Sequence, residues 1–255
     1  MYYYIFDVKK CKKRTQVEEI KNHLSVLGIS GEYVYPTAAQ TVEELVDAGI
    51  AKKYNTIVGI GDDEIANRIA NRLCGRQEVM GFVPIEATED LLALIGSRNW
   101  KDGCDSLRYR KITEMHMGRT AVNTGFLTNI SLDLTAPIDL TLEFRDFVLQ
   151  TKAKSFLVSN YSSHIEKHST DSLDIEIHSV EEATGGFFKK LFMNPSKKIG
   201  HSSFHVRSLR VFTKYQIPFI LGNYIVAKTP QLIESTDEKV RIITAKGSTN
   251  DTVDT

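Results

Sequence analysis

The sequence predicts an α/β domain, with a parallel sheet between two helical layers, followed by a β-sandwich domain. Strand-like and helix-like runs alternate over the first 95 residues, which is the pattern of a parallel sheet covered on both faces. After about residue 108 the runs are rich in β-branched and aromatic residues, as in antiparallel strands. We therefore predict an α/β domain over 1–108, a β-sandwich over 109–245 whose last strand can return to the first domain, and a disordered tail over 246–255.

The α/β domain consists of strand patterns and helix patterns in strict alternation. The strand patterns are short apolar runs, and the helix patterns repeat apolar residues every three or four positions. In chain order they are a strand at Tyr2–Val8, a helix at Gln16–Leu27, a strand at Tyr33–Tyr35, a helix at Val42–Tyr54, a strand at Thr56–Gly61, a helix at Ile65–Cys74, a strand at Val79–Ile85 and a helix at Glu89–Ile95.

The second domain is predicted from short runs that suit antiparallel strands. Gly185–Met193 interrupts them, because its phenylalanines recur at helical spacing. The predicted strands are Ile112–Met117, Leu140–Phe144, Phe156–Ser159, Leu173–Ile177, Phe204–Phe212 and Lys239–Ile243.

Composition limits the function classes. The chain has 255 residues, of which 42% are hydrophobic, and its 32 Lys+Arg balance 32 Asp+Glu. A net charge of zero argues against nucleic acid as a partner, because binding to phosphate backbones needs an excess of basic residues. The odd number of widely spaced cysteines excludes a disulfide framework and a Cys-x-x-Cys knuckle, and favours a reducing compartment: Cys11, Cys74 and Cys104. Lysines follow the first apolar run, whereas in a signal peptide basic residues precede the apolar stretch. No run approaches the ~18 apolar residues that a membrane-spanning helix needs, so we expect a cytoplasmic protein.

Two strand-to-helix turns carry most of the functional information, because ligands of open parallel sheets bind beyond the carboxyl ends of the strands. The first turn reads Gly61-Asp62-Asp63-Glu64. The second runs from Pro84 through Ile85, Glu86, Ala87, Thr88 and Glu89 to Asp90.

Five motifs in order along the chain resemble those of the diacylglycerol kinase catalytic-domain family, which is related to the sphingosine kinases and, more remotely, to the NAD kinases. Gly61 and Asp63 match the family's Gly-Gly-Asp-Gly-Thr, and Ala70–Leu73 matches the end of the helix that follows. Pro84-Ile85 and Asp90 match the two ends of the family's Pro-Leu-Gly-Thr-Gly-Asn-Asp, and Val158–Asn160 matches its Val-Ser-Asn. Further along the chain, Asp171–Ile175 resembles the family's Asp-Gly-Leu-Leu-Asp-Val, and Leu221–Asn223 resembles its Asp-Gly-Glu.

The resemblance implies a nucleotide-binding first domain and transfer of the γ-phosphoryl group of ATP, with Mg²⁺, to the hydroxyl of a lipid such as diacylglycerol. It implies that Asp63 and Gly222 belong to the catalytic site and that Asp63 and Glu64 lie near the metal. The residues it assigns to the nucleotide are Gly61, Asp62, Asp63, Glu64, Pro84, Glu86, Thr88 and Asp90.

The glycines of both phosphate turns are replaced in this chain. Glycine lets a triphosphate approach backbone N–H groups, and a Cβ hinders that approach. Acidic residues should instead line one edge of the sheet, namely Asp62, Asp63, Glu64, Glu86, Glu89 and Asp90. Three interpretations follow: the acids cap their own helices, they bind a divalent cation, or the nucleotide site tolerates them.

The motifs expected near the phosphate acceptor also differ. Leu221 and Asn223 flank Gly222 where the family has acids, and His116-Met117-Gly118 replaces Asp-Leu-Gly. Glu166 or His168 could supply a base instead. The hypotheses are therefore an ATP-dependent lipid kinase, or a pseudokinase scaffold whose interdomain cleft binds a metal, a non-phosphate ligand or a protein partner.

Two further patterns have alternative interpretations. His164 with His168, and His201 with His205, have the spacing of metal ligands on a helix, but their serine-rich surroundings favour exposed loop histidines. Phe187, Phe188, Lys189 and Lys190 suit either contact with an anionic membrane or packing of the aromatic face on the sandwich. A homodimer is also compatible with the sequence.

Overall fold

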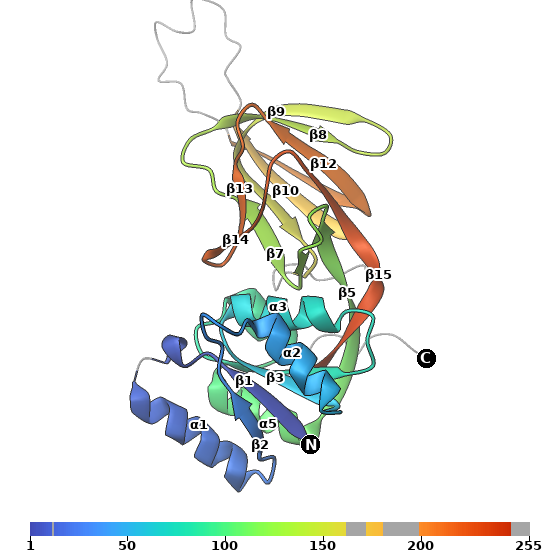
Figure 1. The fold of residues 1–255 in the computed structure, drawn as a ribbon. Coiled ribbons are helices and arrows are strands. Elements are labelled where there is room, and N and C mark those ends of the chain that lie inside the picture. The colour runs from blue at the N-terminus through green and yellow to red at the C-terminus, as the bar shows by residue number, and fades with distance from the viewer. Residues whose placement is uncertain (12, 162–171, 181–198, 246–255) are drawn as a thin grey trace, which may run out of the picture.

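The computed structural model describes residues 1–11, 13–161, 172–180 and 199–245. Figure 1 shows two lobes stacked end to end, one of helices around a sheet and one of strands alone. Two long strands, β5 (Lys111–Thr120) and β15 (Gln231–Thr244), run from one lobe into the other. No helix in the described part of the chain is both long and apolar enough to cross a membrane.

The helical lobe is built on a parallel sheet in the order β2-β1-β3-β4-β15. Every residue of β3 and β4 is buried, which is typical of central strands with helices on both faces. At the far edge β15 lies parallel to β4 and antiparallel to β5. The other strands are β1 (Tyr2–Phe6), β2 (Gly31–Val34), β3 (Thr56–Gly61) and β4 (Val79–Pro84).

Helices cover both faces of this sheet and confirm the predicted three layers. On one face, Ile20 and Leu24 of α1 pack with Leu107 of α5. On the other face, α2, α3 and α4 pack in a second core with residues such as Leu45 and Ile69. The helices are α1 (Arg14–Val26), α2 (Val42–Ala51), α3 (Asp63–Leu73), α4 (Glu89–Ile95) and α5 (Trp100–Tyr109), with a 3₁₀ turn η1 (Val8–Lys10) after β1.

The strand lobe is antiparallel and encloses its own apolar core, which includes Phe126, Phe156 and Phe219. Strand β9 is central, because it pairs with β7, β8 and β10 along its length. The remaining strands are β6 (Gly125–Phe126), β7 (Asn129–Leu132), β8 (Ile138–Glu143), β9 (Val148–Ser159), β10 (Leu173–Val180), β11 (Ile199–Val206), β12 (Ser208–Thr213), β13 (Pro218–Leu221) and β14 (Tyr224–Lys228).

Two asparagines, Asn67, which is buried, and Asn160, which is half-buried, join the lobes through backbone groups. Asn67 of α3 accepts a hydrogen bond from the Leu127 N–H at 2.7 Å. Asn160, at the end of β9, donates to the carbonyls of His116 and Leu127 at 3.0 and 2.9 Å. Because Leu127 takes part in both contacts, the segment after β6 is fixed to both lobes.

The structure corrects three expectations. Phe204–Phe212 is not one strand: β11 and β12 are separated at Arg207, and they pair with different neighbours. His201 and His205 lie on β11, not in a loop. Helix α5 was not expected, because Gly103 in its middle weakens the helical pattern; a Cβ there would lie 2.6 Å from Pro84, so glycine permits close packing on β4.

Several predictions fall outside the described residues. They concern the catalytic alternatives Glu166 and His168, the pair that includes His164, the segment Gly185–Met193 with Phe187, Phe188, Lys189 and Lys190, and the tail 246–255.

Candidate functional site

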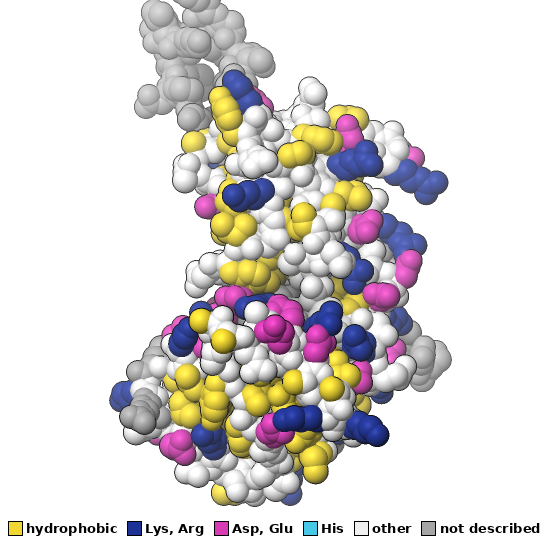
Figure 2. All heavy atoms as spheres, viewed as in Figure 1, with side chains coloured by type: hydrophobic (Ala, Val, Ile, Leu, Met, Phe, Trp, Pro, Cys, Tyr) yellow, Lys and Arg dark blue, Asp and Glu magenta, His cyan; other side chains and the backbone are white. Residues whose placement is uncertain are grey.

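A small cleft lies where the carboxyl ends of the parallel strands meet the strand lobe. Its volume is about 110 Å³. Figure 2 shows acidic and basic side chains crowded at this junction, on the part of the helical lobe that faces the strand lobe. The cleft is lined by Lys10, Asp62, Asp63, Glu64, Glu86 and Thr88 from the helical lobe and by Leu221, Gly222, Asn223 and Tyr224 from the strand lobe.

Asp62 caps the first helix at the cleft. Its backbone is extended, and its carboxylate accepts a hydrogen bond from the Ile65 N–H at 3.4 Å, so it meets the positive end of α3. The other carboxylate oxygen lies 2.6 Å from Lys10 Nζ, and this contact raises the pKa of Lys10. Both oxygens of Asp62 therefore already have positively polarised partners.

Asp63 joins the two predicted turns. It is only 4% exposed, and its carboxylate accepts from the Thr88 N–H at 2.8 Å and from the Thr88 hydroxyl at 2.6 Å. Thr88 is in turn the N-cap of α4, since its hydroxyl oxygen accepts from the Leu91 N–H at 3.5 Å. Burial raises the pKa of Asp63, and the hydrogen bonds from Thr88 offset part of that shift.

The strand lobe closes the cleft above Asp63 with the turn between β13 and β14. Gly222 in this turn has φ of +56°, a conformation that favours glycine, and a Cβ added to it would lie 3.8 Å from the Asp63 Cβ. Burial raises the pKa of Tyr224, with further contributions from the charges of Glu64 and Asp63. The site thus places the predicted Asp63 and Gly222 directly opposite each other.

Three of the residues predicted for the nucleotide do not line the cleft. Gly61 is buried at the end of β3, where a Cβ would lie 3.3 Å from Ile65, so its small size serves packing on α3. Pro84 is the buried last residue of β4. The Asp90 carboxylate accepts a hydrogen bond from the Asn129 side chain.

Lys10 and Tyr224 line the cleft but were not selected from the sequence. Lys10 belongs to the lysines that follow the first apolar run, and because that run is a parallel strand, Lys10 reaches the same sheet edge. Topology was the signal that could have identified it. The position of Tyr224 in the cleft depends on how the two lobes pack together, and no sequence pattern here indicates that packing.

The residues of the cleft do not fit a triphosphate. Among the described lining residues, four are acidic and Lys10 is the one basic side chain, already paired with Asp62. Two like charges ~4 Å apart repel by about 4 kcal/mol at an effective dielectric of 20. The Thr88 N–H, a potential phosphate donor, is already bonded to Asp63.

The predicted metal ligands are also engaged by protein groups. Asp63 accepts from Thr88 through both oxygens, and one oxygen of Glu64 lies 3.3 Å from Arg68. Among the described residues, neither belongs to a group of three or more side chains close enough to share a cation. The arrangement does not resemble a formed Mg²⁺ site.

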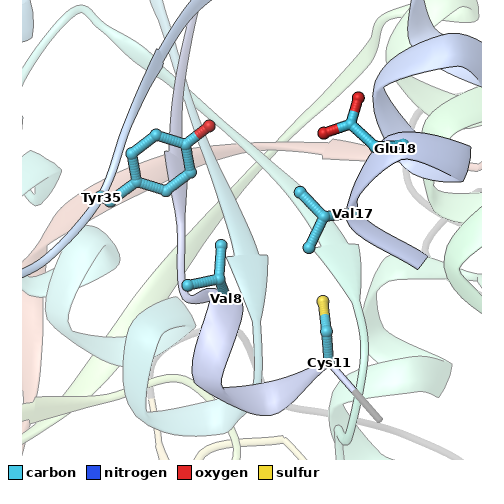
Figure 3. A pocket seen from close by; sticks show the side chains of 5 residues that line it. All are labelled: Val8, Cys11, Val17, Glu18 and Tyr35. Atoms are coloured by element: carbon cyan, nitrogen blue, oxygen red, sulfur yellow. The ribbon is translucent and has the colours of Figure 1, made fainter. Parts of the chain in front are cut away.

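A larger pocket of about 520 Å³ lies beyond the end of β1, beside α1. Figure 3 shows its five side chains around one open space, with Tyr35 opposite Val17 and Glu18 of the helix and Val8 and Cys11 below. Glu18 is the charged group of this mostly apolar lining, and burial raises the pKa of Cys11. Among the described residues that line this pocket, none is basic, as a phosphate ligand would need.

Comparisons with known proteins show which solved structures have a similar fold. Neither a protein-family model nor a curated protein sequence matches the chain. The structure of a diacylglycerol kinase from Bacillus anthracis str. Sterne is similar with a TM-score of 0.73, at 14% identity over 97% of each chain. Yeast NADH kinase, solved in complex with NADH, has a TM-score of 0.54 at 9% identity, over 99% of this chain and 85% of that one. The protein thus has the two-lobe fold of the diacylglycerol kinases.

Proposed function

We propose that this protein is a pseudokinase: it keeps the lipid-kinase scaffold, does not bind a nucleoside triphosphate, and uses the cleft between its lobes to bind a positively charged ligand or protein group. The observation that carries the proposal is the hydrogen bonding of Asp62 and Asp63. These two side chains accept from backbone N–H groups at both strand-to-helix turns.

The charge of the cleft supports a cationic partner. Asp62, Asp63, Glu64 and Glu86 converge on a space of about 110 Å³, and the single lysine there neutralises one of them. Such a site repels phosphate and attracts ammonium or guanidinium groups. A small cleft also favours a side chain or a small ion over a whole nucleotide.

A second candidate is an ATP-dependent kinase that acts on a lipid hydroxyl. It is favoured by the position of Asp63, which faces Gly222 across the junction of the lobes, as the matching motifs imply. Under this alternative, MgATP binding would have to break the contacts between Asp63 and Thr88 and displace Lys10 from Asp62.

Thermal melting with MgATP separates the two candidates. A ligand at about 100 times its dissociation constant adds ~2.7 kcal/mol of stability, which raises the Tm of a chain of this size by roughly 5–10 °C. We expect no measurable shift at millimolar MgATP, and no phosphoryl transfer to diacylglycerol. A clear shift together with transfer that is lost in Asp63→Asn would favour the kinase.

The same melting experiment, carried out with a cationic ligand, tests for binding in the cleft. We expect a diamine such as putrescine to raise the Tm, and we expect the shift to shrink in Glu64→Gln. A shift of equal size in this variant would remove the cleft from the interaction.

A further inference from the structure

A stripe of ionisable side chains crosses two neighbouring strands of the second lobe. Strands β10 and β11 are antiparallel, and every second pair of their register sets Asp174 opposite His205, Glu176 opposite Ser203, and His178 opposite His201. Because side chains alternate along a strand, these rows share one face. The opposite face of β10 carries buried core residues, which include Leu173, Ile175 and Ile177.

Three members of this stripe converge. A carboxylate oxygen of Glu176 and ring nitrogens of His178 and His201 all lie within 4.8 Å of one another. The two imidazole rings face each other across the strand pair, with centroids 5.0 Å apart. The backbone register fixes this arrangement, since His178 is directly opposite His201 and Glu176 is two residues along the same strand.

We propose that Glu176, His178 and His201 form a zinc site. Two histidines and one carboxylate are a ligand set that zinc accepts, with water as the fourth ligand. Zinc bonds of about 2.0–2.1 Å place tetrahedral donor atoms roughly 3.4 Å apart. The three donor atoms here lie within 4.8 Å of one another, so a modest change of side-chain rotamers would bring them to the ion. Imidazole ligands favour zinc over Mg²⁺ or Ca²⁺, which prefer oxygen.

The neighbouring row defines the limit of the site. Asp174 is 4% exposed, and its carboxylate contacts Nδ1 of His205, so this histidine is held by its own partner one row beyond Glu176. His205 is therefore not the fourth ligand. The ion would link β10 to β11 from the outer face of the lobe. None of its ligands lines the cleft between the lobes, so this proposal is independent of the proposed function.

The test is a zinc titration of the full chain after treatment with a chelator, followed by competition with a chromogenic chelator. The sequence contains seven histidines, so the comparison between variants identifies the site. We expect His178→Ala, His201→Ala and Glu176→Gln each to weaken one zinc site by more than about tenfold, since the loss of even an outer-shell partner costs about that much. His23→Ala is the matched control, because His23 on α1 also lies 3.1 Å from a carboxylate, that of Asp105, and we expect it to leave zinc binding unchanged.

Cobalt(II) gives a second readout that does not depend on stability. We expect the visible absorption of tetrahedral cobalt in the wild type and in His23→Ala, and its loss in His201→Asn with an unchanged circular dichroism spectrum. The proposal is overturned if the wild type takes up no zinc, if all three ligand variants bind zinc as the wild type does, or if His23→Ala causes the same loss.

Discussion

Replacing Asn67 with alanine is expected to lower the free energy of unfolding by about 2–3 kcal/mol. Asn67 is 1% exposed, and its side chain accepts from the Leu127 N–H at 2.7 Å and donates to the Asp63 carbonyl at 2.7 Å. Alanine leaves the Leu127 N–H without its partner in a buried place, which is the costly part of the change. Urea denaturation followed by circular dichroism measures the effect.

Asn71→Ala is the control for this prediction. Asn71 lies one turn further along α3 and makes the equivalent contact with the Gly125 N–H, but at 3.1 Å and at a less buried position. We expect a loss below about 1 kcal/mol, as for an ordinary hydrogen bond near solvent. Equal losses in the two variants would contradict the role given to Asn67.

The second large effect is expected at Asp63, where alanine should cost about 1–2 kcal/mol and asparagine much less. Asparagine retains an acceptor for the Thr88 N–H and places a donor near the Thr88 hydroxyl, whereas alanine removes both contacts. Chemical denaturation at pH 7 compares the two variants with the wild type. If asparagine cost as much as alanine, the negative charge of Asp63, and not its hydrogen bonds, would hold the two turns together.

The stability of Asp63→Asn relative to that of the wild type is also expected to depend on pH. Burial raises the pKa of Asp63 in the folded state above the ordinary value of 3.8 for an aspartate, so the folded protein binds this proton more tightly than the unfolded chain does. The contribution of Asp63 to stability is therefore fully present below pH ~3.8 and is lost as the pH rises through the raised pKa. Relative to the wild type, Asp63→Asn should gain stability across this interval and stay level above it. A relative loss would mean that the folded-state pKa is lowered.

Much of the helical lobe was predictable because its signals are local. Strand Thr56–Gly61 and helix Glu89–Ile95 occur with the expected bounds, since a continuous apolar run marks the first and a threonine cap marks the second. The strand lobe was predicted less well. Strands as short as Gly125–Phe126 carry too few residues for a pattern. The apolar alternation changes phase at Arg207-Ser208, which marks the break between β11 and β12 that the prediction of one strand missed.

The site was predictable in part for the same reason. Asp62, Asp63 and Thr88 follow neighbouring parallel strands, so the topology alone brings them together. That Gly222 lies above Asp63 depends on the docking of the lobes. The partner of Asp90 is Asn129 of the strand lobe, a contact between residues 39 positions apart that no local pattern indicates.

The proposed function requires that acidic side chains fill the place where a kinase of this fold would hold a triphosphate. Isothermal titration of MgATP into the wild type and into Asp62→Gly/Glu64→Gly tests it most directly, because glycine is a tolerable N-cap and the scaffold should remain folded. Glu19→Gln/Glu234→Gln is the control, since it removes the same charge from residues that do not line the cleft. We expect no binding to the wild type or the control, and measurable binding to the glycine variant. Micromolar binding of MgATP to the wild type, weakened in the glycine variant, would contradict the account.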